Sequence, residues 1–298
     1  MADQKKAYLY GISAVLLWST VASAFKISLR YMASCELLLF SSLTSLVVLA
    51  TVLFLQGRLG QTLFSSPQEY GRSLKLGFLN PFLYYLMVFK AYELLPAQEA
   101  QPINYTWAIT LTLLAIPLLK QKITLKEIAA VIVSYCGVFV ISTRGAVFAP
   151  HISSPIGVAL ALASTVVWAL YWIFNTRDTR DPVAGLFLNF VCGVPLVFLY
   201  CLIFIGLRLP SYRGLLGAVY SGVFEMGITY VLWLSALRES ENAARVSNLI
   251  FLSPFLSLVF IHFLVGERIY TSTYVGLLLI MAGLGVQHLR KRPVEQPR

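Results

Sequence analysis

Long apolar stretches alternate with short polar segments along almost the whole chain. Each stretch is long enough to cross the hydrocarbon core of a bilayer, which needs roughly 20 apolar residues per helix. The connections between them are short, so successive helices must run antiparallel. The pattern predicts an all-α integral membrane protein with ten transmembrane helices, at about 7–29, 34–56, 74–93, 97–117, 124–143, 154–175, 183–205, 212–236, 243–264 and 270–289.

Composition supports this class. The 298 residues are 58% hydrophobic and only 12% charged, whereas soluble domains are about one quarter charged. The net charge of +10 would also suit a nucleic-acid partner, but the basic residues are scattered between apolar stretches rather than gathered in one block. We therefore expect a lipid bilayer and no nucleic acid. The four cysteines lie in or beside apolar stretches without metal-ligand spacing, so we interpret them as small buried hydrophobes and expect no metal or cofactor.

The distribution of Lys and Arg predicts which way the chain crosses the membrane. Cytoplasmic loops carry an excess of these residues. With the N-terminus in the cytoplasm, sixteen of the 23 fall on the inner side, and the outer side holds only Lys26, Arg30, Lys90, Arg144, Arg208, Arg213 and Arg268. Residues 22–24 (ASA) resemble a signal-peptidase site, but the first stretch is long enough to remain as an uncleaved helix. The bias predicts that both termini are cytoplasmic.

The second half of the chain repeats the first. A shift of 145 residues places Gly77, Tyr85 and Ala91 on Gly222, Tyr230 and Ala236, and a shift of 146 places Ala97, Leu118, Ile123, Gly137 and Val140 on Ala243, Leu264, Ile269, Gly283 and Val286. Five spans per repeat is an odd number, so the two copies, 1–145 and 146–298, must enter the membrane from opposite sides. Such inverted repeats typically hold a binding site near the membrane midplane, between the halves.

Glu225 is the most informative single residue, because it lies near the middle of the eighth apolar stretch. A carboxylate at that depth costs a few kcal/mol, so it should face the interior of the bundle, paired or protonated. It could couple transport to protons or pair with a substrate ammonium group. A purely structural hydrogen bond between helices is the alternative.

Other polar and aromatic residues recur at helical spacing. Gln101, Asn104, Tyr105 and Ala108 share one face of the fourth stretch, and Trp168 and Tyr171 lie on the sixth. The amides could bind the ammonium and carboxylate of an amino acid, and the rings could line an apolar pocket. Ordinary interhelical bonding and an interfacial aromatic belt remain open. We add Trp18, Tyr84 and Tyr230 as candidate substrate-binding residues, while Lys26 should either reach the outer headgroups or line an electropositive vestibule.

Several motifs resemble the drug/metabolite transporter superfamily, in particular its EamA-type members. They are residues 14–20 (AVLLWST), 92–97 (YELLPA), 253–255 (SPF) and 266–268 (GER). The resemblance implies two five-helix repeats around a central cavity lined by helices 1, 3, 4, 6, 8 and 9. Residues 103–107 (INYTW) and 168–171 (WALY) are similar to aromatic amino acid exporters of the YddG type, although Ala108 and Glu225 depart from that pattern.

Together these features predict a carrier of the bacterial inner membrane. We expect it to export small polar metabolites, most readily aromatic or neutral amino acids, by alternating access. The alternative is another solute class, such as a drug cation, a nucleotide sugar or a sugar-like metabolite, with proton-coupled uptake as one possibility. The chain has no HExxH sequence, P-loop or Ser-His-Asp set, so we do not expect an enzyme. The partners should be a small-molecule substrate and lipid, and the protein a monomer or a homodimer.

Overall fold

The computed structural model describes residues 3–119, 124–146, 148, 152–206, 209–240, 246 and 248–288. The described chain is helical, and eight of its helices are long and apolar enough to cross a membrane. A shorter apolar helix follows over Thr271–Val286. The interrupted run from Pro67 to Leu94, which is the third span in sequence order, completes the ten. The spans are α1 (Gln4–Ser28), α2 (Ser34–Leu55), α4–η1–α5 (Pro67–Gly77, Phe78–Leu83, Tyr84–Leu94), α6–α7 (Ala97–Tyr105, Trp107–Leu119), α8 (Leu125–Ser142), α9 (Pro155–Asn175), α10 (Pro182–Phe204), α11–α12 (Tyr212–Phe224, Ile228–Glu239), η2–α14–η3 (Asn248–Leu252, Ser253–Phe260, Ile261–Val265) and α15 (Thr271–His288).

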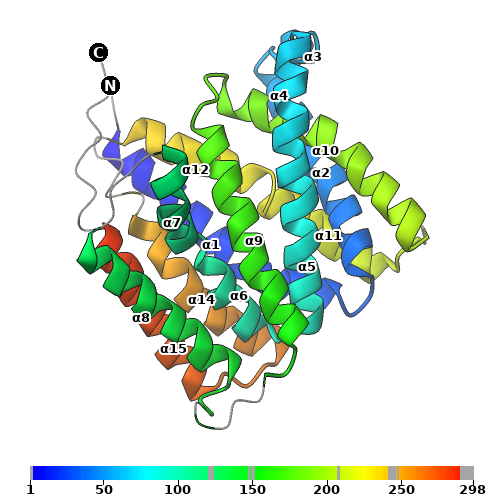
Figure 1. Ribbon diagram of the computed structural model, residues 1–298. Helices are drawn as coiled ribbons and strands as arrows, with labels where there is room; N and C mark the ends of the chain where they lie inside the picture. Colours follow the sequence, from blue (N-terminus) through cyan, green and yellow to red (C-terminus); the bar gives the residue numbers. More distant parts are fainter. Residues whose placement is uncertain are drawn as a thin grey trace.

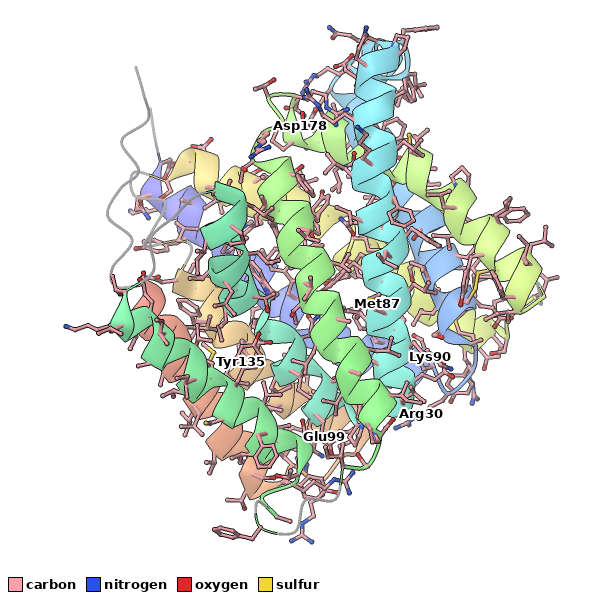
Figure 2. All side chains as sticks on the ribbon, in the orientation of Figure 1. Arg30, Met87, Lys90, Glu99, Tyr135 and Asp178 are labelled. Carbon is pink, nitrogen blue, oxygen red and sulfur yellow. A yellow bond between two sulfur atoms is a disulfide. The ribbon has the colours of Figure 1, made fainter. Side chains whose placement is uncertain are left out.

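The predicted number and order of spans are therefore confirmed. The start of α1 and the end of α15 lie on the same side of the bundle (Figure 1), and we call this side the terminal face. The other side, the opposite face, carries Arg30, Lys90 and Glu99, while Asp178 lies at the terminal face (Figure 2). The start of the ninth predicted span, at 243–245, lies outside the described residues.

The helix contacts follow an inverted twofold arrangement. The pair α1 and α12 corresponds to α9 and α5, α2 with α11 corresponds to α10 with α4, and α1 with α14 corresponds to α9 with α7. Two further pairs, α8 with α15 and α2 with α10, each consist of equivalent helices from the two repeats, so the internal symmetry maps each pair onto itself. Figure 1 shows α8 and α15 side by side along one edge of the molecule. The largest contacts made by one repeat are thus repeated by the other.

The third span begins earlier than predicted. Residues 57–73 were expected to form a polar connection, but they contain the short helix α3 (Leu59–Leu63) and the first turns of α4. The reason is a capping box. Ser66 accepts a hydrogen bond from the Glu69 amide at 3.3 Å, and the Glu69 carboxylate accepts one from the Ser66 amide at 2.8 Å. This reciprocal pair satisfies two otherwise free amides at the start of α4.

Two spans are broken near their middle. In the third span Asn80 leaves helical geometry (φ −144°, ψ 116°), and the next residue, Pro81, has no amide hydrogen for the preceding turn. In the eighth span α11 ends at Phe224, and Gly227 (φ −115°, ψ −99°) precedes α12. Asn80 and Glu225 are equivalent under the 145-residue shift that relates the repeats. The internal symmetry therefore extends to the positions at which the helices break.

The prediction for the cysteines was wrong. Cys35 near the start of α2 and Cys201 near the end of α10 form a disulfide, with their Cα atoms 6.0 Å apart. Cys136 is exposed and Cys192 is half-buried. The disulfide connects residues 166 positions apart in the sequence and lies near the opposite face, so it joins the first repeat to the second.

Candidate functional site

Glu225 lies at the break of the eighth span, where the helical hydrogen-bond pattern is interrupted. Side chains replace the missing backbone partners. The Phe224 carbonyl accepts a hydrogen bond from the Thr229 hydroxyl, the Met226 carbonyl accepts one from Ser45 Oγ at 2.9 Å, and Trp18 Nε1 donates to the Glu225 carbonyl at 3.5 Å. Because each of these carbonyls has a partner, the break is a stable feature at membrane depth.

The Glu225 side chain faces aromatic residues of other helices. Tyr85 on α5 donates its hydroxyl hydrogen to Glu225 Oε1 at 3.1 Å. On α1, the ring of Trp18 lies edge-on to Tyr230 with 5.8 Å between ring centroids, and 5.5 Å from Trp233. The carboxylate is thus held between α5 of the first repeat and the broken span of the second. The sequence showed Tyr85 only as a position of the internal repeat and did not identify it as the partner of Glu225.

A second group of predicted residues surrounds Asn104. The Tyr84 hydroxyl donates to Asn104 Oδ1 at 3.2 Å, and Asn104 Nδ2 donates to Ser164 Oγ at 3.0 Å. Tyr84 stacks on Trp168 with 4.3 Å between centroids, and Trp168 stacks on Tyr171 at 5.5 Å. Tyr84 and Tyr85 are adjacent rings, with centroids 4.8 Å apart, so the Asn104 group and the Glu225 group form one polar and aromatic cluster.

Gln101 and Tyr105 lie on α6, on the side of this cluster that faces the second repeat. Ser257 of α14 donates a hydrogen bond to Gln101 Oε1. Tyr105 ends α6 and is only partly buried. Trp18, Asn104, Glu225 and Tyr230 also keep part of their surface accessible, although they face one another inside the bundle. Solvent can therefore reach part of each of these side chains.

The structure brings together residues that the sequence predicted only one helix at a time. Of the nine candidates, Trp18, Tyr84, Asn104, Trp168, Tyr171, Glu225 and Tyr230 are linked by the hydrogen bonds and ring contacts above. Sequence reasoning missed Ser164 and Trp107, whose ring centroid lies 6.5 Å from that of Trp168. Their only sequence signal was a position on the same helical faces as Trp168 and Asn104.

At the opposite face, the corner between α5 and α6 is held from two sides. Lys26 Nζ donates to the carbonyls of Tyr92 at 2.8 Å and Leu95 at 2.6 Å. Glu267 accepts hydrogen bonds from the Ala97 amide at 2.8 Å and the Gln98 amide at 3.1 Å. A charge of suitable sign therefore lies at each helix terminus. Lys26 turns toward the protein here, so of the two predicted alternatives the one in which it reaches the headgroups was wrong. It lines a pocket at this face instead.

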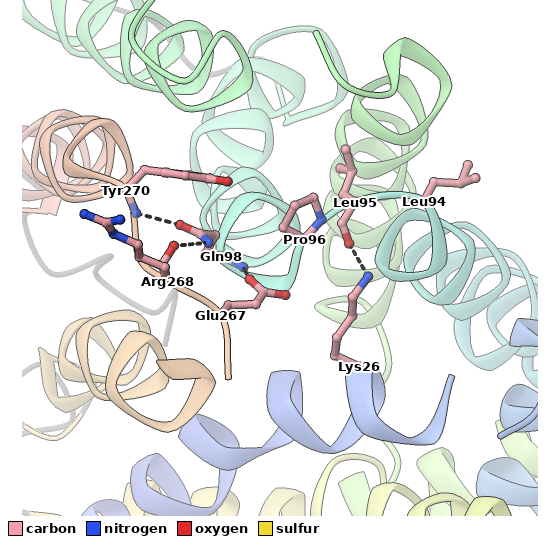
Figure 3. A pocket seen from close by; sticks show the side chains of 8 residues that line it. All are labelled: Lys26, Leu94, Leu95, Pro96, Gln98, Glu267, Arg268 and Tyr270. Carbon is pink, nitrogen blue, oxygen red and sulfur yellow. Dashed lines mark hydrogen bonds between the residues drawn. The ribbon is translucent and has the colours of Figure 1, made fainter. Parts of the chain in front are cut away.

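The same corner borders a surface pocket of about 420 Å³, shown from close by in Figure 3. Gln98 crosses it, donating to the Arg268 carbonyl at 2.9 Å and accepting from the Tyr270 amide at 2.8 Å. These bonds, with those of Glu267, tie the first repeat to the second. None of the nine predicted binding residues lines this pocket, so it is separate from the polar and aromatic cluster.

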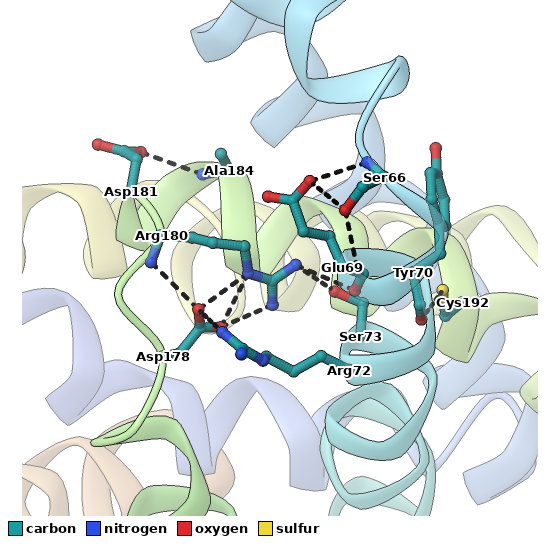
Figure 4. Close-up of polar contacts among 10 residues, drawn as sticks. All are labelled: Ser66, Glu69, Tyr70, Arg72, Ser73, Asp178, Arg180, Asp181, Ala184 and Cys192. Carbon is teal, nitrogen blue, oxygen red and sulfur yellow. Dashed lines mark hydrogen bonds and ion pairs between the residues drawn. The ribbon is translucent and has the colours of Figure 1, made fainter.

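At the terminal face, an ion-pair cluster anchors the first turns of α4 (Figure 4). Arg180 binds both carboxylate oxygens of Asp178, with the shorter contact at 2.6 Å, and also donates to Ser73 Oγ at 2.8 Å. Arg72 lies 3.3 Å from the same carboxylate. Partial burial acts to raise the pKa of Asp178, but hydrogen bonds and positive charge from Arg180, with a smaller effect of Arg72, lower that pKa below its ordinary value.

Comparison with known proteins places this architecture. The model of the EamA-like transporter family matches residues 5–143 and again 155–286. An uncharacterized transporter of Archaeoglobus fulgidus is 24% identical over 283 residues, covering 93% of this chain and 96% of that protein. One of Clostridium kluyveri is 28% identical over 173 residues, which cover 56% of this chain and 55% of that protein.

Two further similarities bear on fold and substrate. The aromatic amino acid exporter YddG of Ancylobacter novellus is 24% identical over 247 residues, covering 80% of this chain and 82% of that protein. A crystal structure that is 21% identical superposes with a TM-score of 0.67 and covers 99% of this chain and all of its own; this likeness concerns the fold alone. Since the family match accounts for both repeats, the chain belongs to the EamA-like transporter family.

Proposed function

We propose that this transporter exports amino acids with aromatic or neutral side chains across the bacterial inner membrane by alternating access. The observation that carries the proposal is the position of Glu225, a carboxylate at a helix break, 3.1 Å from Tyr85 of the other repeat. Transporter sites typically lie at such discontinuous helices between inverted repeats. The similarity to YddG, an aromatic amino acid exporter, supports the same solute class.

The chemistry of the cluster matches the parts of an amino acid. Glu225 can pair with an ammonium group, since a carboxylate beside a cation forms a strong charge-assisted hydrogen bond. The amides of Asn104 and Gln101 can donate to a carboxylate. The stacked rings of Tyr84 and Trp168, 4.3 Å apart at their centroids, offer an apolar surface for the substrate side chain.

Glu225 would also couple transport to protons. A carboxyl group in the bundle interior can take up a proton from one side and release it to the other as the repeats exchange access. The excess of Lys and Arg that the sequence places on one side supports an orientation with both termini in the cytoplasm. In that orientation the terminal face is the cytoplasmic face, and the closed corner of Figure 3 is the outer one.

An organic cation is the second candidate substrate. Glu225 has the rings of Trp18, Tyr85 and Tyr230 close to it, and these rings bear a negative π-face. Aromatic faces beside a carboxylate are the usual recognition elements for substituted ammonium groups. Such a substrate would use Glu225 but would leave the amides of Asn104 and Gln101 without a role.

One experiment distinguishes these substrates. The protein is reconstituted in liposomes, and release of three labelled solutes with the same ring is followed with and without a pH gradient: phenylalanine, phenethylamine, which lacks the carboxylate, and phenylpropionate, which lacks the amine. We expect release of phenylalanine alone. Release of phenethylamine at an equal or higher rate would favour the organic cation, and release of none of them, with a labelled hexose or nucleotide sugar released instead, would overturn the proposal.

A further inference from the structure

The break in the third span differs from its counterpart in the partners of its polar groups. At the Glu225 break, side chains from neighbouring helices or turns satisfy the carbonyls described above. At the Asn80 break, the side-chain oxygens of Asn80 and of Asn189 on α10 have no hydrogen-bond partner among the described residues. Both side chains are only 1% exposed. Buried polar groups of this kind cost free energy unless something binds them.

The two asparagines lie close together because α10 packs tightly on the break. A β-carbon at Gly77 would collide with the Asn189 carbonyl, and one at Gly193 would lie 2.7 Å from the Pro81 ring. The Tyr171 side chain interacts with both amides. Asn80, Asn189 and Tyr171 thus form a compact, uncharged and deeply buried group on three spans, which we call the asparagine cluster.

The surroundings of the asparagine cluster favour a positive charge. The helix α4 has 11 residues and ends at Gly77, so the negative end of its dipole points to the break. Pro81 supplies no amide hydrogen to that last turn, but the π-helix η1 that follows pairs its carbonyls with amides one residue further along. The amide oxygens of Asn80 and Asn189 are therefore the two ligands that the cluster itself supplies, of the kind that hard cations prefer.

The charge of the cation follows from the same residues. The cluster contains no carboxylate, and the nearby Asp178 is bound to Arg180 at 2.6 Å; divalent ions usually take carboxylate ligands. Unwound backbone and half-helix C-terminal ends are the places where transporters coordinate sodium. We propose that the asparagine cluster at the break of the third span binds a sodium ion.

Sodium binding is tested on the purified full-length protein without any substrate, so the result does not depend on the proposed amino acid transport. The melting temperature Tm is measured in sodium, potassium and choline chloride at equal ionic strength, and binding of radioactive sodium is measured directly. We expect Tm to be about 3 °C higher in saturating sodium than in choline. Equal Tm values in sodium and choline, with no bound radioactive sodium, would mean that water alone satisfies the cluster and would overturn the proposal.

Variants locate the site. Asn189→Leu should abolish the sodium-dependent shift, and Asn189→Asp, which adds a negative charge, should raise the sodium affinity about tenfold. Glu225→Gln, at the equivalent position of the other repeat, should keep the wild-type sodium response. If Asn189→Leu does not fold, Asn189→Asp still decides, because an unchanged sodium affinity in that variant contradicts coordination at Asn189. A sodium response lost in Glu225→Gln would place the ion at the other break instead.

Discussion

The two helix breaks occupy equivalent positions in the two repeats but carry different chemistry. At the eighth span, the break has a carboxylate whose neighbouring carbonyls are bonded to Trp18, Ser45 and Thr229. At the third span, it has an amide, Asn80, with an unpaired oxygen beside the unpaired side-chain oxygen of Asn189. One break can exchange a proton, and the other can only supply dipoles. Duplication thus preserved the geometry, whereas the ionisable group is present in a single copy.

The difference shows how an inverted pair can be symmetric in structure and asymmetric in mechanism. Helix contacts repeat between the halves, so both breaks are positioned by the same packing. The chemistry at each break depends on one residue and its neighbours. Three of the following variants alter one break, or the contacts that hold it, and leave the other break unchanged; the fourth alters the residues between the breaks.

The largest effect should come from releasing the half-helix that precedes the Asn80 break. Asp178→Ala leaves Arg180, whose side chain is 9% exposed, without its carboxylate partner, and we expect a loss of about 3 kcal/mol in the free energy of unfolding. Because the folded-state pKa of Asp178 is lowered, its stabilisation is present above the unfolded pKa and is lost as pH falls through the folded value. Unfolding in detergent between neutral and acidic pH measures both effects. A variant whose free energy of unfolding falls with acid as much as that of the wild type would contradict them.

The close packing of α10 on the Asn80 break should give the next largest effect. Gly77→Ala places a β-carbon against the Asn189 carbonyl, and such overpacking should cost about 2 kcal/mol. Gly71→Ala in the same helix is the matched control, since nothing lies within 4 Å of its β-carbon, and it should stabilise α4 by about 0.7 kcal/mol. Thermal unfolding of both variants measures the difference; equal Tm values would show that α10 does not hold the break.

At the other break, Glu225→Gln removes the charge and keeps the shape of the side chain. We expect transport to lose its dependence on the pH gradient and its rate at neutral pH to fall about tenfold, equivalent to about 1.4 kcal/mol. The free energy of unfolding should change little, because Tyr85 can still donate to the Gln oxygen. Liposome transport over a range of pH measures the first effect, and an unaltered pH profile would exclude Glu225 as the coupling group.

The smallest effect should come from Asn104, which lies between the two breaks in the Tyr84–Trp168 group. Asn104→Ala removes the hydrogen bonds to Tyr84 and Ser164, and we expect substrate affinity to fall about fivefold, or about 1 kcal/mol. Stability should fall by less than this. Binding and unfolding measured on the same preparation separate the two; a lower Tm with normal affinity would make Asn104 a structural residue.

Much of the fold was predictable because membrane spans are a local property of the sequence. Apolar length and the Lys and Arg distribution identified ten spans and their inverted halves. The division at residue 145 stays a prediction. The early start of α4 was missed because its first turns are polar and depend on the capping box of Ser66 and Glu69. The Cys35–Cys201 pair was missed because it depends on how α2 meets α10, which no local pattern encodes.

The candidate site was predictable in its parts but not in its connections. Glu225 is conspicuous as a charge in an apolar stretch, and Asn104 as an amide on an inward face. That Tyr85 binds Glu225, and that Asn80 faces Asn189, follows only from the packing of spans remote in sequence. A proline within an apolar stretch, such as Pro81, indicates a kink, yet no local pattern indicates that Glu225 and Gly227 interrupt a span without proline.

The disulfide between α2 and α10 limits how the two repeats can move. These helices form one of the two pairs that map onto themselves under the internal symmetry, and near the terminal face Arg58 lies 3.2 Å from Asp181 at the start of α10. A covalent bond at one end and an ion pair at the other make the pair a static seam. In the proposed alternating access, opening toward either compartment would then occur by tilting the remaining helices around this seam. If the seam does not part during transport, reduction of the disulfide should leave the turnover unchanged.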